Sequence, residues 1–159
     1  MNYADKVMDP GRLLIWRSQM LEQGKKLVVT NGCFDLLHAG HVQYLASARE
    51  AGDCLLVGLN GDQSVKALKG PTRPVNPEQD RALVLAGLAS VDAVCIFPEK
   101  RATRFLNSVC PDVYVKGGDY TLQSLDPEER EAVQQHGGQI IFIPFLQGRS
   151  TSELIRRMG

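Results

Sequence analysis

Five short apolar runs alternate with segments of helical spacing along this chain of 159 residues, and this alternation restricts the fold more than any other feature. The runs lie at residues 25–30, 53–59, 91–97, 112–115 and 139–144. Runs of this length are typical of strands that are buried on both faces. Helices are expected at 9–23, 40–51, 64–69, 77–89, 100–109, 126–136 and 150–158. The pattern predicts an α/β fold with a doubly wound, five-stranded parallel sheet.

Length and charge limit the class of protein. We expect one domain over residues 1–159, in which residues 1–24 form an N-terminal helical extension. The 18 basic and 18 acidic residues cancel, so no overall charge favours nucleic acid as a partner. No apolar run approaches the ~18 residues of a membrane span, and no signal peptide is evident. We therefore expect a cytoplasmic protein without a nucleic-acid or membrane partner.

The cysteines give no sign of a metal or redox motif. Cys33, Cys54, Cys95 and Cys110 lack paired spacing, so reduced thiols are the expected state. Cys33 differs from the others because it lies inside the motif described next, where its thiol could touch a substrate.

A turn rich in glycine and histidine, residues 31–41, follows the first apolar run and leads into a helix. The helix should point its free N–H groups and its positive dipole end at a ligand above the strand. Gly32 and Gly40 would let the backbone approach that ligand. His38 and His41 could both donate to phosphate oxygens. The turn therefore predicts an anion site, whose loop Asp35 could hold through backbone N–H groups, unless it faces a metal.

Polar residues follow the next strand at the same edge of the predicted sheet. Asn60 and Asp62 are placed either to reach a ligand or only to cap the next helix. Lys69 and Arg73 belong to a basic cluster that is either a solvated surface or part of the site. Arg81, one turn into the following helix, could reach toward phosphates or pair with Glu78 or Asp80.

Two more segments should reach this edge. Lys116, Gly118 and Asp119 directly follow the fourth strand. Ser150 and Thr151 stand at the start of the last helix, where they form either a plain cap or a second phosphate site.

The pattern Gly-x-Phe-Asp-x-x-His-x-Gly-His at residues 32–41 resembles the signature of the nucleotidyltransferase superfamily, which includes cytidylyltransferases, pantetheine-phosphate adenylyltransferase and class I aminoacyl-tRNA synthetases. The resemblance implies a Rossmann-like nucleotidyltransferase fold. It also implies that His38 and His41 contact a nucleotide triphosphate and stabilise charge on the α-phosphate while a substrate phosphate attacks. Neither a G-x-G-x-x-G nor a Walker motif is present.

A closer resemblance covers about residues 25–158. The segments 31–41, 58–62, 68–76 and 115–120 look like the stand-alone form of the adenylyltransferases that make ADP-heptose from heptose 1-phosphate. That family implies the transfer of AMP from ATP, with Mg²⁺, to D-glycero-D-manno-heptose 1-phosphate for lipopolysaccharide core synthesis. Its relatives are often dimers, so we also expect a homodimer.

The resemblance assigns a role to each candidate residue. The catalytic residues would be His38, His41 and Lys69. The nucleotide would contact Gly32, Cys33, Phe34, Asp35, Gly40, Lys116, Gly118, Asp119, Ser150 and Thr151. The phosphosugar would contact Asn60, Asp62, Arg73 and Arg81. No resident metal is expected, because a zinc site formed by Cys33, His38 and His41 would need three ligands from one tight turn.

Two alternatives stay open. The nearest is a cytidylyltransferase acting on glycerol phosphate or another polyol phosphate, although residues 117–120 read Gly-Gly-Asp-Tyr where those enzymes tend to have Gly-Asp-Asp-Trp. The other is a nucleotide-binding module without catalysis, against which the intact histidine pair argues. Residues 150–152 read Ser-Thr-Ser in place of the family's usual Ser-Thr-Thr, which keeps the hydroxyls. The sequence does not identify the sugar.

Overall fold

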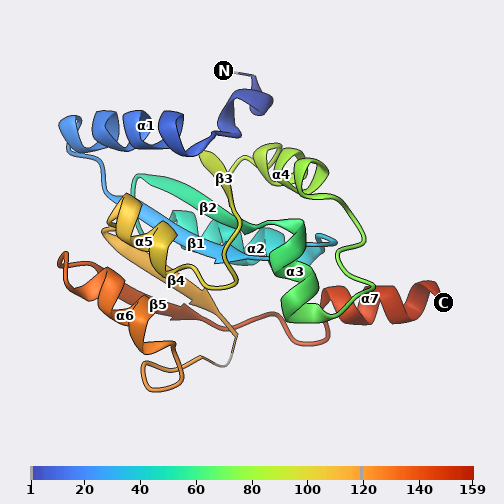
Figure 1. Cartoon of the computed structure of the whole chain (residues 1–159). Helices are drawn as coiled ribbons and strands as arrows, with labels where there is room; N and C mark the ends of the chain where they lie inside the picture. The colour runs from blue at the N-terminus through green and yellow to red at the C-terminus, as the bar shows by residue number, and fades with distance from the viewer. Residues whose placement is uncertain (1, 119) are drawn as a thin grey trace.

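The computed structural model describes residues 2–118 and 120–159 and contains the predicted five-stranded parallel sheet (Figure 1). The strands are β1 (Leu27–Gly32), β2 (Cys54–Asn60), β3 (Ala93–Phe97), β4 (Val113–Gly117) and β5 (Gln139–Ile143). Their order across the sheet is β3-β2-β1-β4-β5, so the chain builds one side of β1 first and then crosses to the other. The predicted α/β fold is confirmed.

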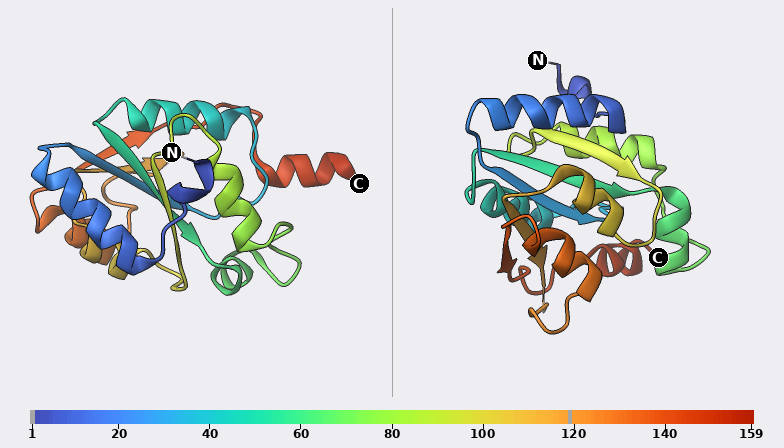
Figure 2. Two further views of the ribbon diagram at one scale, coloured as in Figure 1. Left: turned by 90° about the horizontal axis from the view of Figure 1, so that it is seen from above. Right: turned by 60° about the vertical axis from the view of Figure 1, so that its left-hand side comes forward.

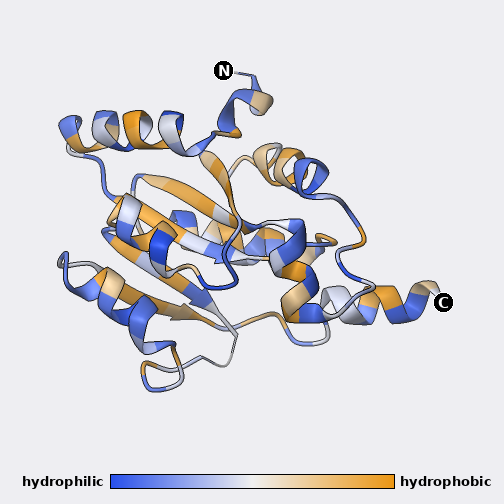
Figure 3. Ribbon diagram, viewed as in Figure 1, coloured by the Kyte–Doolittle hydropathy of each residue, from blue (hydrophilic) through white to orange (hydrophobic). Residues whose placement is uncertain are grey.

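Helices cover both faces of the sheet (Figure 2). One face packs against α1 (Pro10–Glu22), α5 (Thr103–Val109) and α6 (Pro127–Gln134), and the other against α2 (Ala39–Arg49) and α4 (Glu78–Ala86). Alternate residues of β1 serve the two cores, since Leu27 and Val29 lie in the first and Val28 in the second. The strands are accordingly apolar along most of their length (Figure 3), as burial on both faces requires.

Two helices follow strands at the carboxyl edge of the sheet and lie beside that edge. α3 (Asp62–Lys69) follows β2, and α7 (Thr151–Met158) follows β5 and projects from the body (Figure 2). A short 3-10 helix, η1 (Tyr3–Lys6), precedes α1, and beyond it the Met8 N–H donates to the Val94 carbonyl of β3 at 2.9 Å. Across the described residues, no helix combines the length and apolar character that a membrane span needs.

Helix α4 differs from the prediction at both ends. It begins after Pro77, because Asn76 directs its backbone N–H and its side-chain amide to Asp35 and does not cap the helix. It ends before Gly87 and not at the expected residue 89, so Ala89 lies beyond the helix and is exposed. Helix α5 likewise begins later than the expected residue 100.

Strands β1 and β4 separate toward their carboxyl ends. In the described part of the chain, they pair only at Val28 and Val29 of β1, whereas β1 pairs with β2 over its whole length. Beyond this point, the Thr30 hydroxyl donates to the Val115 carbonyl at 2.9 Å in place of a backbone bond. The direction of winding also reverses between these two strands. A switch point of this kind opens a crevice at the carboxyl edge of the sheet.

Candidate functional site

A cavity of about 490 Å³ opens at this crevice. Its walls come from the turn after β1, the first turns of α2 and α7, the end of α3 and the segment after β4. The predicted site residues that line it are Gly32, Cys33, Phe34, Asp35, His38, Gly40, His41, Asn60, Lys69, Arg73, Lys116, Ser150 and Thr151. The fold therefore brings most of the candidates from distant segments to one place.

The histidine pair caps α2. His38 is the N-cap residue, and its Nδ1 accepts from the Gly40 N–H at 3.1 Å. Nδ1 of His41 accepts from the His38 N–H at 3.4 Å, which completes a reciprocal capping box. The ring centroids lie 3.9 Å apart. Because both Nδ1 atoms accept, each neutral imidazole carries its proton on Nε2 and presents that N–H as a donor.

Both imidazoles are neutral at pH 7 in the free protein. Burial, helped by the neighbouring His38 ring, lowers the pKa of His41 to about 4. Burial and then the Arg149 guanidinium lower the pKa of His38. The positive end of the α2 dipole adds to the cost of a proton on either ring. A bound anion would reverse this balance, because nearby negative charge raises the pKa of an imidazole.

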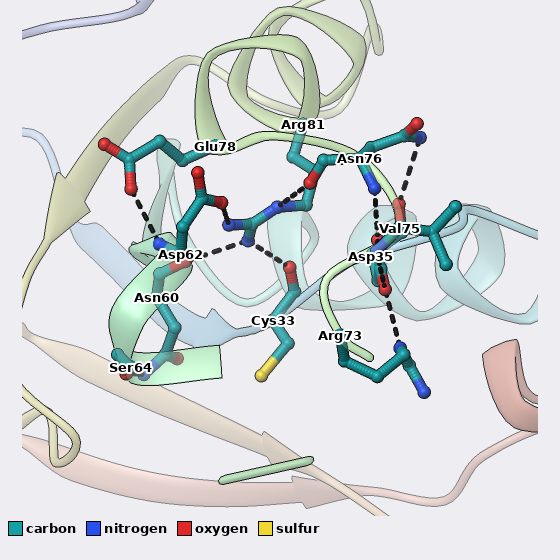
Figure 4. Close-up of polar contacts among 10 residues, drawn as sticks. All are labelled: Cys33, Asp35, Asn60, Asp62, Ser64, Arg73, Val75, Asn76, Glu78 and Arg81. Carbon is teal, nitrogen blue, oxygen red and sulfur yellow. Dashed lines mark hydrogen bonds and ion pairs between the residues drawn. The ribbon is translucent and has the colours of Figure 1, made fainter. Parts of the chain in front are cut away.

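Asp35 holds the loop that precedes α4 (Figure 4). Its carboxylate accepts from the N–H groups of Val75 and Asn76, at 2.9 and 3.0 Å, and from Arg73 Nε at 2.7 Å. Burial alone would raise the pKa of Asp35, but the hydrogen bonds from Asn76, Val75 and Arg73 outweigh it and lower the pKa. The carboxylate thus holds the loop before α4, 38 to 41 residues away, and not its own turn as the sequence suggested.

Arg81 pairs with a carboxylate, as one alternative had it, but the partner is Asp62 and not Glu78 or Asp80. Its guanidinium is buried and makes its hydrogen bonds to Asp62 and to the carbonyls of Cys33, Asn60 and Asn76 (Figure 4). Neither Arg81 nor Asp62 belongs to the described residues that line the cavity. The expected contact of both side chains with the phosphosugar has no support in this geometry, since the buried Arg81 guanidinium and the partly exposed Asp62 carboxylate are paired with each other.

Three other predicted residues need separate comment. Asn60 lines the cavity, but its amide donates to the Ser64 hydroxyl at 2.7 Å, so the side chain is engaged with the start of α3. Gly118 is not among the described lining residues. Asp119 lies outside the described residues.

Basic side chains surround the cavity. They are Lys69, Arg73, Lys100, Lys116 and Arg149. Lys116 is partly buried, which lowers its pKa, and its Nζ lies 4.7 Å from the centre of the Tyr120 ring. Among the described lining residues, Asp35 supplies the one carboxylate, and it is already paired with Arg73. The cavity therefore favours an anionic ligand.

The cysteines of the structure are all free. Cys33 lines the cavity, and burial raises the pKa of its thiol although Lys69 and Arg81 act in the opposite direction. The thiol is therefore neutral at pH 7. Cys54 and Cys95 are buried, and burial raises the pKa of each to about 11.

Helix α7 joins the histidine turn through its first residues. The Ser150 hydroxyl accepts from the Glu153 N–H at 3.0 Å and caps the helix. The Thr151 hydroxyl donates to the Leu36 carbonyl at 2.8 Å and so ties α7 to the turn after β1. The N-termini of α2 and α7 consequently border the same cavity.

Gly40 and Gly117 lie where any side chain would collide with neighbouring groups. A Cβ on Gly40 would lie 2.9 Å from Nδ1 of His38 and 3.2 Å from the Cβ of Arg149, so a side chain would push the ends of α2 and α7 apart. A Cβ on Gly117 would overlap the Phe145 ring. At the end of β4 the Phe145 ring therefore packs directly on the bare backbone of Gly117.

Several lining residues were not assigned from the sequence. They are Asn31, Lys100, Tyr120, Phe145, Arg149 and Ser152, besides four apolar or glycine positions. Asn31 and Tyr120 lie within the segments 31–41 and 115–120, and Arg149 directly precedes the predicted Ser150, but none of the three was given a role. Phe145 carries no sequence signal, because its place in the wall depends on how the loop after β5 folds back over Gly117.

The donor set does not resemble a metal centre. Over residues 2–118 and 120–159, no group of three or more His, Cys, Asp or Glu side chains could hold a metal ion. Nδ1 of each histidine accepts a backbone N–H, and the Asp35 oxygens are engaged.

Known proteins share this sequence over most of its length. A family model described as cytidylyltransferase-like matches residues 29–157. The bifunctional protein HldE of Methylobacillus flagellatus is 51% identical over 98% of this chain, and that of Alkalilimnicola ehrlichii is 54% identical over 85%. The matches cover 32% and 28% of those proteins, so the chain spans about a third of the length of these curated relatives.

Solved structures share the fold. The lipopolysaccharide core biosynthesis protein from Thermoplasma volcanium has a TM-score of 0.62 at 25% identity, and the match covers 79% of this chain and 100% of that one. Pantoate-beta-alanine ligase from Francisella tularensis, at 17% identity, has a TM-score of 0.60 over 92% of this chain and 68% of that one, which shows the fold alone. Since the family model spans most of the sequence and includes the histidine turn, this chain belongs to the cytidylyltransferase-like family.

Proposed function

We propose that this chain is a nucleotidyltransferase that moves AMP from MgATP to D-glycero-D-manno-heptose 1-phosphate, giving ADP-heptose and pyrophosphate for lipopolysaccharide core synthesis. The observation that carries the proposal is the shared cavity, in which the N-termini of α2 and α7 and five basic side chains surround one space. Such a space is complementary to a triphosphate beside a second phosphate. The sequence resemblance and the HldE relatives support the heptose substrate.

In the proposed reaction, an oxygen of the sugar 1-phosphate attacks the α-phosphorus of ATP in line. The new P–O bond forms as the bond from the α-phosphorus to the oxygen bridging it to the β-phosphorus breaks, and pyrophosphate leaves with that oxygen. The nucleophile is already an anion, so the reaction needs no covalent enzyme intermediate. The protein must hold two anions together and stabilise the charge that develops.

The histidine pair is assigned to the α-phosphate. His38 and His41 would each donate from Nε2, and their capping bonds fix that tautomer before the nucleotide arrives. Donors held in place in this way need no reorganisation during the reaction. Lys69 would contact the phosphates from the end of α3.

The remaining contacts follow the walls of the cavity. Because the Ser150 and Thr151 hydroxyls are engaged within the protein, we assign the β- and γ-phosphates to the backbone N–H groups at the start of α7. Lys116, with Asp119, is assigned to the nucleotide, and Arg73 to the sugar phosphate. The turn residues Gly32, Cys33, Phe34 and Gly40 would contact the nucleotide chiefly through their backbone.

The test is a panel of four nucleoside triphosphates crossed with sugar and polyol phosphates, followed by pyrophosphate release and mass spectrometry of the product. We expect release with ATP and the heptose 1-phosphate, and a product with the mass of ADP-heptose. Release with CTP and glycerol phosphate would move the assignment to a cytidylyltransferase. No release with any pair would favour a binding module.

We further propose that the protein acts in the cytoplasm as a homodimer. The sugar nucleotide and ATP are cytoplasmic metabolites in the proposed reaction, and the fold's relatives supply the expectation of a dimer. Light scattering during size-exclusion chromatography would give a mass of twice 17.5 kDa if the dimer forms.

A further inference from the structure

A polar network around the buried Arg81 (Figure 4) adjoins the cavity, because its partners Cys33 and Asn60 line it. The guanidinium donates to the carbonyls of Cys33, Asn60 and Asn76 at 2.7, 2.8 and 3.0 Å, and to the Asp62 carboxylate at 2.8 Å. These partners stand just after β1, at the end of β2, in the loop before α4 and at the start of α3. One side chain therefore joins the segments whose ends form the floor of the cavity.

The network holds the first residue of helix α3, and the Ser64 hydroxyl in the same turn is bonded to Asn60 and to the Glu99 carbonyl. The helix has no side-chain cap of its own, and its first residue is held from outside. The Asp62 carboxylate meets Arg81, and the Asp62 N–H donates to the Glu78 carboxylate at 2.7 Å. Lys69 is the last of the eight residues of α3 and lines the cavity. A tilt at Asp62 would be carried along a helix about 12 Å long to the Lys69 ammonium group.

We propose that Arg81 is a positioning residue that acts through Asp62 to aim α3, and hence Lys69, into the anion cavity. The side chain itself touches no substrate. The planar guanidinium is suited to this task because its N–H groups point in fixed directions, which a lysine ammonium cannot reproduce. The inference rests on the proposed function, in which Lys69 contacts the phosphates.

A second buried arginine provides a matched control. Arg17 donates to the Val109 and Cys110 carbonyls, both at 2.9 Å, and to Asp112 at 3.3 Å. The side chains of Asp62 and Asp112 are exposed to a similar extent, 38% and 40%. Asp112 lies at the start of β4, at the opposite edge of the sheet from the cavity. Both pairs share their chemistry, but only one of them adjoins α3.

The experiment is a double-mutant cycle on the full chain, with Asp62→Ala and Lys69→Ala made singly and together. We expect Asp62→Ala to lower kcat about tenfold alone and less than about twofold when Lys69 is already alanine, because the two changes act through one contact. Arg81→Lys should show the same dependence on Lys69. Asp112→Ala should lower the midpoint of urea unfolding but leave kcat unchanged.

Hydrogen exchange supplies a readout that does not depend on turnover. Amides of α3 should exchange faster in Asp62→Ala and unchanged in Asp112→Ala. Equal kcat losses in both Lys69 backgrounds, or unchanged exchange in α3, would overturn the positioning role. If wild-type protein turns over no substrate pair, the proposed function fails, while the exchange result still decides whether the network positions α3. Should Arg81→Lys not fold, the half-exposed Asp62 still permits the test.

Discussion

Arg17 and Arg81 are buried at opposite edges of the same sheet, and each donates to backbone carbonyls and to one aspartate. The carbonyl partners of Arg17 are consecutive residues, the last residue of α5 and the residue after it, so this arginine holds the end of a single helix against α1. Arg81 donates to carbonyls from three separate segments, and two of these segments border the open cavity.

The difference follows from the direction of the chain in a parallel sheet. Helices return antiparallel to the strands, so their N-termini gather at the carboxyl edge and their C-termini at the amino edge. The amino edge also has a hollow, of about 420 Å³, lined in part by Lys25, Lys26 and Asp112. It adjoins the residues after α1 and α6, where the dipoles end negative. Thus Arg17 packs a helix end at the amino edge, whereas the similar Arg81 supports the segments around the anion-favouring cavity at the carboxyl edge.

The largest effect is expected from His41, because its side chain is assigned to the α-phosphate. Histidines, like the buried arginines, occur at both edges of the sheet, so His136 serves as the control. His41→Ala removes an Nε2 donor from the cavity and should lower kcat by ~10²–10³ while the fold is retained. His136→Ala changes an exposed residue after α6, at the amino edge, and should leave kcat unchanged. Steady-state pyrophosphate release checks both. A His41→Ala protein with more than half of the wild-type activity would contradict the assignment.

A smaller loss is expected when the loop before α4 is released. Asp35→Asn keeps the shape of the side chain, but it loses the charge that binds Arg73 and presents an NH₂ group toward the Val75 and Asn76 N–H groups. We expect kcat/KM to fall by about 10–10² and the free energy of unfolding to fall by about 1–3 kcal/mol.

The matching change at the amino edge is Asp112→Asn. Asp112 accepts from the Leu27 N–H at 2.7 Å and from Arg17, so a similar loss of stability is expected in urea unfolding. Its kcat/KM should equal that of the wild type. Equal catalytic losses for the two variants would mean that Asp35 acts on stability alone.

The sequence was sufficient for the sheet because each strand is a short apolar run, and those side chains need cover on both faces whatever their neighbours are. The exact helix limits were less certain. Asn76 is a residue type that often caps helices, but Asp35, 41 residues away, fixes its side chain elsewhere: the Asp35 carboxylate accepts its backbone N–H, and the Asp35 backbone carbonyl accepts its side-chain amide. The local preference of Asn76 for a helix cap was therefore outweighed by its hydrogen bonds to Asp35.

The same limit applies to the cavity. The spacing of His38 and His41 already places both at one helix start, so local sequence predicts their position. Arg81 has no such signal: a basic side chain one turn into a helix reads as a phosphate contact until the ends of β1 and β2 are seen converging on it. The position of a side chain whose partners come from several segments cannot be predicted from local sequence.

Stability should depend on pH through the histidine turn. Burial lowers the pKa of His41 to about 4 in the folded protein, whereas an unfolded chain has a value near ~6.5. The unfolded state therefore binds a proton first, so the stability contributed by the neutral ring is present above pH 6.5 and lost as the pH falls toward 4. Urea unfolding at pH 7.5, 6 and 5 should show a steeper loss for wild type than for His41→Asn. Parallel losses would indicate that other groups control the decline.

The smallest effect concerns the bond that ties α7 to the histidine turn. Thr151→Val removes the hydroxyl that donates to the Leu36 carbonyl and should raise the KM for ATP about three- to fivefold, near the ~1 kcal/mol expected for one hydrogen bond. Thr103→Val is the control, because the buried hydroxyl of Thr103 has no hydrogen-bond partner in the described structure. Removing an unpaired hydroxyl should leave KM unchanged and stability unchanged or higher. If both variants raise KM equally, the α7 contact is not what holds the second helix N-terminus at the cavity.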